Sequence, residues 1–147
     1  MKISHRTLQF QTKGEFDFVD FTAEVEKFVS DCQIKNGFVN IQTMHTTAPL
    51  FLNENEPLLL EDFKKHLSQI SPQNAAYNHN DFKRRTVNMC DGECQNGHAH
   101  CTALHFPSNL VLNVIDGKIQ LGQWQRIFLT ELDKSKPRKV QIQAIGE

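Results

Sequence analysis

Histidine, cysteine and acidic side chains gather in two short stretches of the chain. The first, HTTAPLFLNENE, begins at His45 and brings an imidazole, hydroxyls, amides and carboxylates together. The second, CDGECQNGHAHC, begins at Cys90 and contains three of the four cysteines and two of the seven histidines. Imidazole, thiolate and carboxylate groups bind transition metals and also serve as acids and bases in catalysis. Each stretch is therefore a candidate wall of an active site.

The spacing in the second stretch argues against a zinc finger or ribbon. Cys90 and Cys94 are close enough to form one ligand pair, but His98, His100 and Cys101 follow sooner than the ~12–20 residues that separate the pairs of those motifs. A chain of 147 residues also needs no metal to build a core, because it buries about 70% of its unfolded surface. Cys90 and Cys94 remain metal ligands or redox thiols, and Cys101 is a small buried side chain.

Hydrophobic periodicity predicts the elements that position these residues. The dipeptide Asp116-Gly117 is typical of a two-residue hairpin turn. Segment 71–97 is polar, aperiodic and much longer than an ordinary connection, which indicates a functional or mobile loop. The expected strands are 3–11, 38–44, 50–53, 99–106, 110–115, 118–121, 124–132 and 140–145. The expected helices are 17–33 and 56–70, and the first of them is capped by Asp17 and ended by Asn36-Gly37. Consecutive late hairpins indicate one α+β domain, 1–147, with a largely antiparallel sheet and two main helices.

On these elements the histidines occupy three kinds of position. His45 ends a predicted strand, where a rigid element can hold a functional side chain. If segment 99–106 is a strand, His98 just before it and His100 share one face. They can then bind one metal together, one can bind while the other orients, or they are simply surface histidines. His79 lies in the long loop and gains a role if the loop folds back over His45. In the first stretch, Thr46 and Thr47 alternatively satisfy turn backbone groups, while Asn53 to Asn55 cap the next helix.

Composition excludes several classes of function. Sixteen Lys and Arg against seventeen Asp and Glu leave a net charge of −1, so no positive field favours nucleic acid or a membrane surface. The basic runs 83–85 and 134–139 are most simply a loop and a solvated turn. The chain begins without the apolar run of a secretory signal, and no later run is long enough to span a membrane. We therefore expect reduced thiols in a cytoplasmic protein.

The motifs HTTA, LNENE, YNH, NGHAH and DGKIQLGQWQRIFLTELD, in this order, resemble those of the YjbQ-like family, the secondary thiamine-phosphate synthase group. The resemblance covers nearly the whole chain. It implies an α+β fold with a sandwich-like or half-barrel sheet, a homotrimer, a metal-binding pocket of His, Asn and Glu residues, and a weak thiamine-phosphate synthase activity. The family's first histidine falls on His45, its NEN triplet on Asn53, Glu54 and Asn55, its loop histidine on His79, and its Asn-x-x-(Ala/Ser)-His element on Asn96, Ala99 and His100.

The resemblance and the residue types together predict a role for each site residue. We expect a divalent metal, Zn²⁺ or Fe²⁺, or Mg²⁺ if the substrate is a diphosphate. The metal ligands are His45, His79 and His100, with His98, Cys90 and Cys94 as weaker candidates. Glu54 and His45 are the catalytic pair, and the substrate-binding residues are Thr46, Thr47, Asn53, Asn55, Asn96 and Trp124. Trp124 alternatively packs in a core or a subunit interface.

Three hypotheses for the function follow. A synthase would hold two substrates together and stabilise the charge of a leaving diphosphate. A transition-metal-dependent hydrolase would act on a small phosphorylated metabolite, with Glu54 as base or fourth ligand. A trimeric binding protein would capture such a metabolite without catalysis, since the chain has no recognised nucleophile motif. In all three the partner is a small molecule, not a nucleic acid or a membrane.

Overall fold

The computed structural model describes all 147 residues, as two antiparallel sheets with three α-helices and a short 3-10 helix, η1 (Asn78–Asn80). A five-stranded sheet has the order β1-β8-β3-β5-β6 and a three-stranded sheet the order β2-β7-β4. The strands are β1 (Lys2–Gln11), β2 (Asp17–Asp20), β3 (Gly37–Thr43), β4 (Leu50–Asn53), β5 (Asn109–Ile115), β6 (Lys118–Ile119), β7 (Arg126–Glu131) and β8 (Pro137–Gly146). The helices are α1 (Thr22–Cys32), α2 (Pro57–Ile70) and α3 (Gly97–Ala103). The predicted α+β fold with a largely antiparallel, half-barrel sheet is confirmed.

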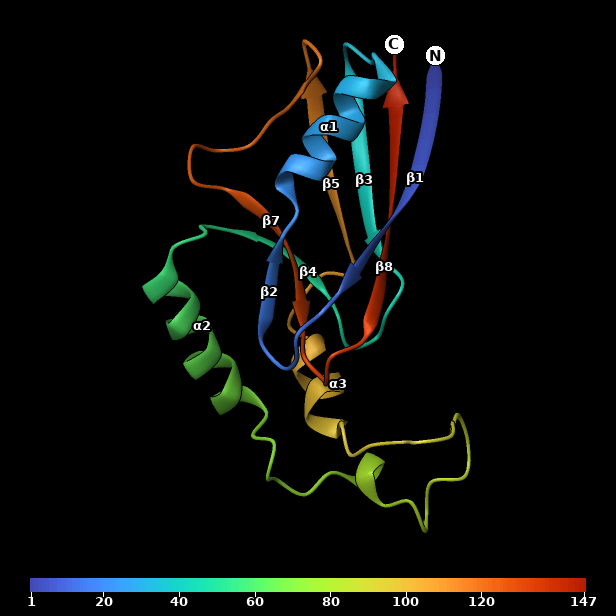
Figure 1. The fold of residues 1–147 in the computed structure, drawn as a ribbon, viewed down its shortest axis with the longest axis vertical. Coiled ribbons are helices and arrows are strands. Elements are labelled where there is room, and N and C mark those ends of the chain that lie inside the picture. The colour runs from blue at the N-terminus through green and yellow to red at the C-terminus, as the bar shows by residue number, and fades with distance from the viewer.

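One core lies between the two sheets and under α1 (Figure 1). Alternation places every second side chain of β3 and β8 on the inner face, so Val39, Ile41, Val140 and Ile142 are buried while their neighbours face outward. Helix α1 adds Val25, Phe28 and Val29 to this core at helical spacing. The termini lie side by side at one end of the molecule, and α3 and the long loop lie at the other end.

The predicted helix 17–33 begins too early. Residues Asp17–Asp20 are strand β2, which pairs with β7, and α1 starts only at Thr22. Phe21 occupies the N-cap position, so the predicted Asp17 cap is wrong. Asp20, one residue earlier, accepts hydrogen bonds from the Thr22 N–H (3.1 Å) and hydroxyl (2.7 Å) and so satisfies the first N–H of the helix. Gly37 does not end the helix but begins β3, where a Cβ would lie 2.0 Å from the Ile145 carbonyl oxygen. Close packing of neighbouring strands therefore explains this glycine.

The predicted strand 99–106 is wrong, because this segment forms most of α3 and the turn that follows it. Asn96 precedes the helix, and its carbonyl accepts the N–H groups of Ala99 (3.0 Å) and His100 (3.3 Å). In a helix, residues two apart point about 200° away from each other. His98 and His100 therefore face different neighbours instead of sharing one face.

Other local predictions are confirmed. Asp116 and Gly117 have φ values of 50° and 76°, the two positive values that a type I′ hairpin requires between β5 and β6. Helix α2 has Pro57 at its first position, and the Glu56 side chain accepts the N–H groups of Leu58 and Leu59. No helix is both long and apolar enough to cross a membrane.

Candidate functional site

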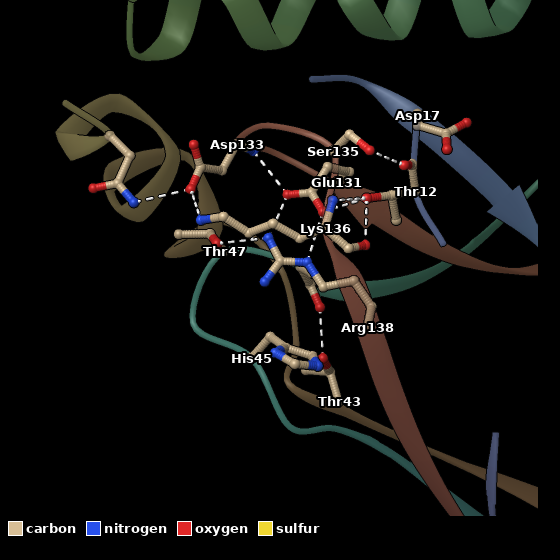
Figure 2. Close-up of polar contacts among 12 residues, drawn as sticks. Thr12, Asp17, Thr43, His45, Thr47, Glu131, Asp133, Ser135, Lys136 and Arg138 are labelled. Atoms are coloured by element: carbon tan, nitrogen blue, oxygen red, sulfur yellow. Dashed lines mark hydrogen bonds and ion pairs between the residues drawn. The ribbon is translucent and has the colours of Figure 1, made fainter. Parts of the chain in front are cut away.

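The inner faces of β7 and β8 end in a buried ion pair instead of an apolar contact (Figure 2). Glu131 continues the inward series of Ile127 and Leu129, and Arg138 begins the series of Val140 and Ile142. Glu131 is fully buried and Arg138 is 5% exposed, with the Arg138 Nε 2.6 Å from a Glu131 carboxylate oxygen. Burying a charge is costly unless it is paired and hydrogen-bonded, so each member of the pair requires the other.

Two further donors complete the shell of the Glu131 carboxylate. The Thr12 hydroxyl donates at 2.8 Å and the Asp133 N–H at 3.0 Å. On the other side, the Arg138 Nη2 donates to the Thr47 hydroxyl at 3.1 Å. Thr47 thus serves the buried pair, while Thr46 is exposed in the same turn. The Asp133 backbone is held in place by this network.

Asp133 joins the buried pair to helix α3. Its carboxylate accepts hydrogen bonds from the Asn96 Nδ2 (3.0 Å) and the Lys136 ammonium, and the Cys94 sulfur lies 3.7 Å from Oδ1. Burial acts to raise the pKa of Asp133, but the hydrogen bonds from Lys136 and Asn96 outweigh it and lower the pKa overall. Asp133 is therefore an anion at neutral pH. Asn96 itself is 6% exposed, and its Oδ1 has no hydrogen-bond partner.

His79 and His100 form a close pair beside Asp133. Their rings are 4.7 Å apart between centroids and meet edge to face. Helix η1 positions His79, and it docks on α3 through the Gly97 N–H, which donates to the Asn80 side-chain oxygen at 2.9 Å. A Cβ at Gly97 would lie 2.6 Å from the Tyr77 Cβ, so the glycine permits this contact. The long loop therefore folds back onto α3, and not over His45.

The surroundings of His100 favour its neutral imidazole. Burial and the neighbouring His79 lower the pKa of His100, with Arg85 and Lys136 adding to the effect and Asp133 opposing it. The His79 Nε2 is buried and has no hydrogen-bond partner. Neutral imidazole is the form that binds a metal ion, and a buried nitrogen without a partner is uncommon in folded proteins.

His45 lies at the edge of the buried ion pair instead of in the histidine pair (Figure 2). Its Nε2 accepts the Lys139 N–H at 2.7 Å and so ties the turn after β3 to β8. Burial and the charge of Arg138 lower its pKa, which keeps the ring neutral and able to accept that bond. Within the single chain, no three His, Cys, Asp or Glu side chains are grouped closely enough to hold a metal. The chain thus brings together two of the three predicted metal ligands.

The remaining predicted substrate residues lie at the far end of β4. One shallow hollow there is lined by Asn53, Glu54 and Trp124. Trp124 is 64% exposed, so it does not pack in the core of this chain. The Asn55 Nδ2 donates to Asp20 at 2.9 Å. His45 precedes β4 and Glu54 follows it, and a strand of four residues spans about 13 Å. One chain therefore keeps the predicted catalytic pair apart.

The weaker metal candidates also separate. His98 is buried, and its Nε2 lies 3.4 Å from the Glu15 carboxylate while Nδ1 has no partner. Cys94 contacts Asp133, whereas Cys90 is exposed with its sulfur 3.7 Å from Glu93. All four cysteines are free thiols.

Sequence reasoning missed the acidic and basic residues that organise the site. Run 134–139 was expected to be a solvated turn, but Lys136 bonds Asp133 and Arg138 is buried. The available signal was the alternation that runs from Arg138 through Val140 and Ile142, which extends the inward face of β8 by one position. A lone charge in an inward position indicates a buried partner.

Comparison with known proteins identifies the family. The family model described as UPF0047 protein YjbQ-like matches residues 6–147. The chain belongs to the YjbQ-like family. A YjbQ-like relative from Archaeoglobus fulgidus, named UPF0047 protein, is 32% identical over 94% of this chain and 98% of its own length. Another from Methanothermobacter thermautotrophicus is 29% identical over 100% of this chain and 95% of its own length.

A solved structure agrees with this YjbQ-like fold. A crystal structure from Sulfolobus solfataricus P2, titled as a YbjQ-like protein of unknown function, superimposes with a TM-score of 0.88. Its sequence is 31% identical, and the match covers 99% of each chain. The YjbQ-like relatives support the family and the fold, and their names state no reaction.

Proposed function

We propose that this YjbQ-like protein is an enzyme with its active centre at His79, His100, Asn96 and Asp133. The observation that carries the proposal is the His79–His100 pair, in which a buried His79 Nε2 has no partner and the rings are 4.7 Å apart. Leaving such a nitrogen unsatisfied costs about 1–3 kcal/mol. Strained or unsatisfied groups of this kind are typical of functional sites.

The residues of the pair fit a divalent transition metal, Zn²⁺ or Fe²⁺. Imidazole nitrogens suit both ions, and the lowered pKa of His100 provides the neutral form that binding requires. His79 and His100 would hold the metal, and the metal would supply a Lewis acid or an activated water. Asp133 and Asn96 would orient the groups beside it. A magnesium site is less suitable here because Mg²⁺ prefers oxygen ligands.

For the third ligand we propose His45, as the family resemblance implies. The turn between β3 and β4 carries it to the same end of the molecule, where its Nε2 accepts the Lys139 N–H. Because one chain groups no three such ligands, His45 of a neighbouring subunit would have to complete the site. Only its Nδ1 is free for a metal while that bond is kept. Loss of bound metal in His45→Ala would support this role, and unchanged binding would assign the site to His79 and His100 alone.

For the specific reaction we propose either thiamine-phosphate synthesis or metal-assisted hydrolysis of a phosphorylated metabolite. The family resemblance supports the first, and the close His79–His100 pair beside an anionic Asp133 supports the second. A cytoplasmic location is in keeping with the four free thiols. If the protein only binds its ligand, a screen would find retention without turnover, with or without metal.

We also propose the homotrimer that the resemblance implies. Helix α2 supports this assembly because it buries only Leu67, and leaves Leu58 68% exposed. Glu54 and His45 could then be brought together between subunits. In that case mixed trimers of Glu54→Gln and His45→Ala chains would recover activity that each variant lacks alone.

The test combines metal content with turnover. Protein purified without added chelator is analysed for bound metal, then assayed against phosphorylated substrates with and without Zn²⁺ and Fe²⁺. We expect metal-dependent turnover that His79→Ala and His100→Ala abolish while the fold is kept. His66→Ala is the matched control, because His66 lies on α2 away from the pair. Turnover that is indifferent to metal and to both variants would overturn the proposal.

A further inference from the structure

Two arginines flank the histidine pair from the long loop. A hollow of about 410 Å³ opens beside His79, lined by Asn78, His79, Arg84, Arg85, Val87 and Asn88. Pockets for small molecules commonly enclose roughly 300–1,000 Å³, so a small metabolite fits. The only apolar side chain in the lining is Val87, and the polar groups are mostly donors.

The loop holds these arginines by its own hydrogen bonds. The Asp81 carbonyl accepts the backbone N–H groups of Arg84 (3.1 Å) and Arg85 (2.9 Å). The Arg84 Nη1 donates to the Asn78 side chain at 3.2 Å, and the Arg85 Nη2 donates to the Asn88 carbonyl at 2.7 Å. Both guanidinium groups are therefore oriented before any ligand arrives, which lowers the entropy cost of binding.

The donors of the hollow exceed its acceptors. Arg85 has one carboxylate partner, Glu93 at 3.3 Å, and its Nη1 is buried without any partner. Arg84 has no carboxylate partner and contacts only the Asn78 amide through its side chain. One acidic group thus opposes two guanidinium charges beside His79. An anionic ligand would satisfy this excess.

We infer that the hollow binds the phosphate group of a small phosphorylated metabolite, with Arg84 and Arg85 on the phosphate oxygens and His79 at the inner wall. This inference assigns the phosphate-binding residues beside the active centre and so rests on the proposed function. A carboxylate is satisfied by a single guanidinium fork, whereas a phosphate dianion offers oxygens to two. His79 lines this hollow and also belongs to the His79–His100 pair, so a bound phosphate would lie beside the proposed active centre.

The test uses inorganic phosphate and pyrophosphate as probes in isothermal titration calorimetry of the full chain. We expect Arg84→Gln to weaken binding by about tenfold or more, because hydrogen bonds to a charged group carry that much affinity. The matched control is Lys83→Gln, which removes an exposed cation from the same loop without touching the lining. Glycerol phosphate should compete with the probe, and glycerol should not.

Arg85→Gln is a second variant, read together with a thermal melt because Arg85 also holds Glu93. Equal weakening by Lys83→Gln and Arg84→Gln would overturn the inference, since it would show a diffuse charge effect. Unchanged binding in Arg84→Gln and Arg85→Gln, or no phosphate binding at all, would overturn it too. A single-stranded oligonucleotide that binds tighter than pyrophosphate would assign the arginines to nucleic acid instead.

Metal content separates this inference from the proposed function. If the wild-type protein binds metal and Arg84→Gln still binds metal but no longer binds phosphate, the proposed function and this inference are both supported. If metal binds but phosphate does not, only this inference fails. If phosphate binds through the arginines while the protein takes up no metal, the hollow is real and the metal centre is not.

Discussion

Replacing Arg138 by methionine should destabilise the protein strongly, because it leaves the buried Glu131 carboxylate without a counter-charge. The Glu131 carboxylate has four donors, the Thr12 hydroxyl, the Asp133 N–H and two from Arg138, and only Arg138 carries a compensating charge. Methionine keeps the aliphatic volume of the side chain but removes the charge and both donors. Removing one member of a buried pair costs about 3–5 kcal/mol. That is a large fraction of the roughly 5–15 kcal/mol that holds a typical domain together.

Urea unfolding followed by circular dichroism measures this loss. A slope of about 1–3 kcal/mol per molar urea converts the expected cost into a midpoint lowered by roughly 2 M. The control variant Lys27→Met breaks an exposed pair with Asp31 and should leave the midpoint where it is. The double variant Arg138→Met/Glu131→Leu should recover much of the loss, because it removes the stranded charge as well. An Arg138→Met midpoint close to wild type would refute the claim that the fold depends on the buried Glu131–Arg138 pair.

Two further predictions concern the edges of the site. The pKa of His45 is lowered below 6.5 in the folded protein, so the unfolded chain binds more protons as pH falls. The free energy of unfolding should therefore decrease as pH drops below about 6.5, and His45→Gln should flatten this decrease in urea titrations at several pH values. If the slope is the same in wild type and variant, another group causes it. Gly97→Ala should cost about 1–3 kcal/mol by overpacking, because its Cβ would lie 2.6 Å from Tyr77. It should also move η1, so that the His79 ring signals shift in NMR spectra, and unshifted signals would show that η1 does not depend on this contact.

The elements that the sequence predicted correctly are those whose signals are local. The hairpin at Asp116-Gly117 needs two positive φ values, and the residue types alone indicate them. Strand β2 was not predicted because its four residues, including Phe18, also fit the helical spacing of the following segment. Only pairing with β7 makes them a strand. Helix α3 was predicted as a strand because small residues such as Ala99 and Cys101 alternate with polar ones, as the residues of a half-buried strand do. A short apolar run does not distinguish a strand from a helix.

The candidate site was predicted by residue type better than by geometry. His79, His100 and Asn96 do lie together with Asp133, as the family motifs suggested for the first three. Their meeting depends on how the long loop folds onto α3, a tertiary contact that periodicity does not encode. Glu54 was paired with His45 because the two are near in sequence, yet β4 carries Glu54 to its far end. Proximity along the chain is a poor guide when a strand intervenes.

The most direct test of the central claim is a crystal structure of the protein grown with Zn²⁺, with anomalous scattering recorded on both sides of the zinc edge. We expect one anomalous peak bounded by the His79 and His100 imidazoles, which disappears in crystals of His100→Ala. A peak at His98 or at Cys94, or no peak beside the His79–His100 pair at millimolar zinc, would contradict it.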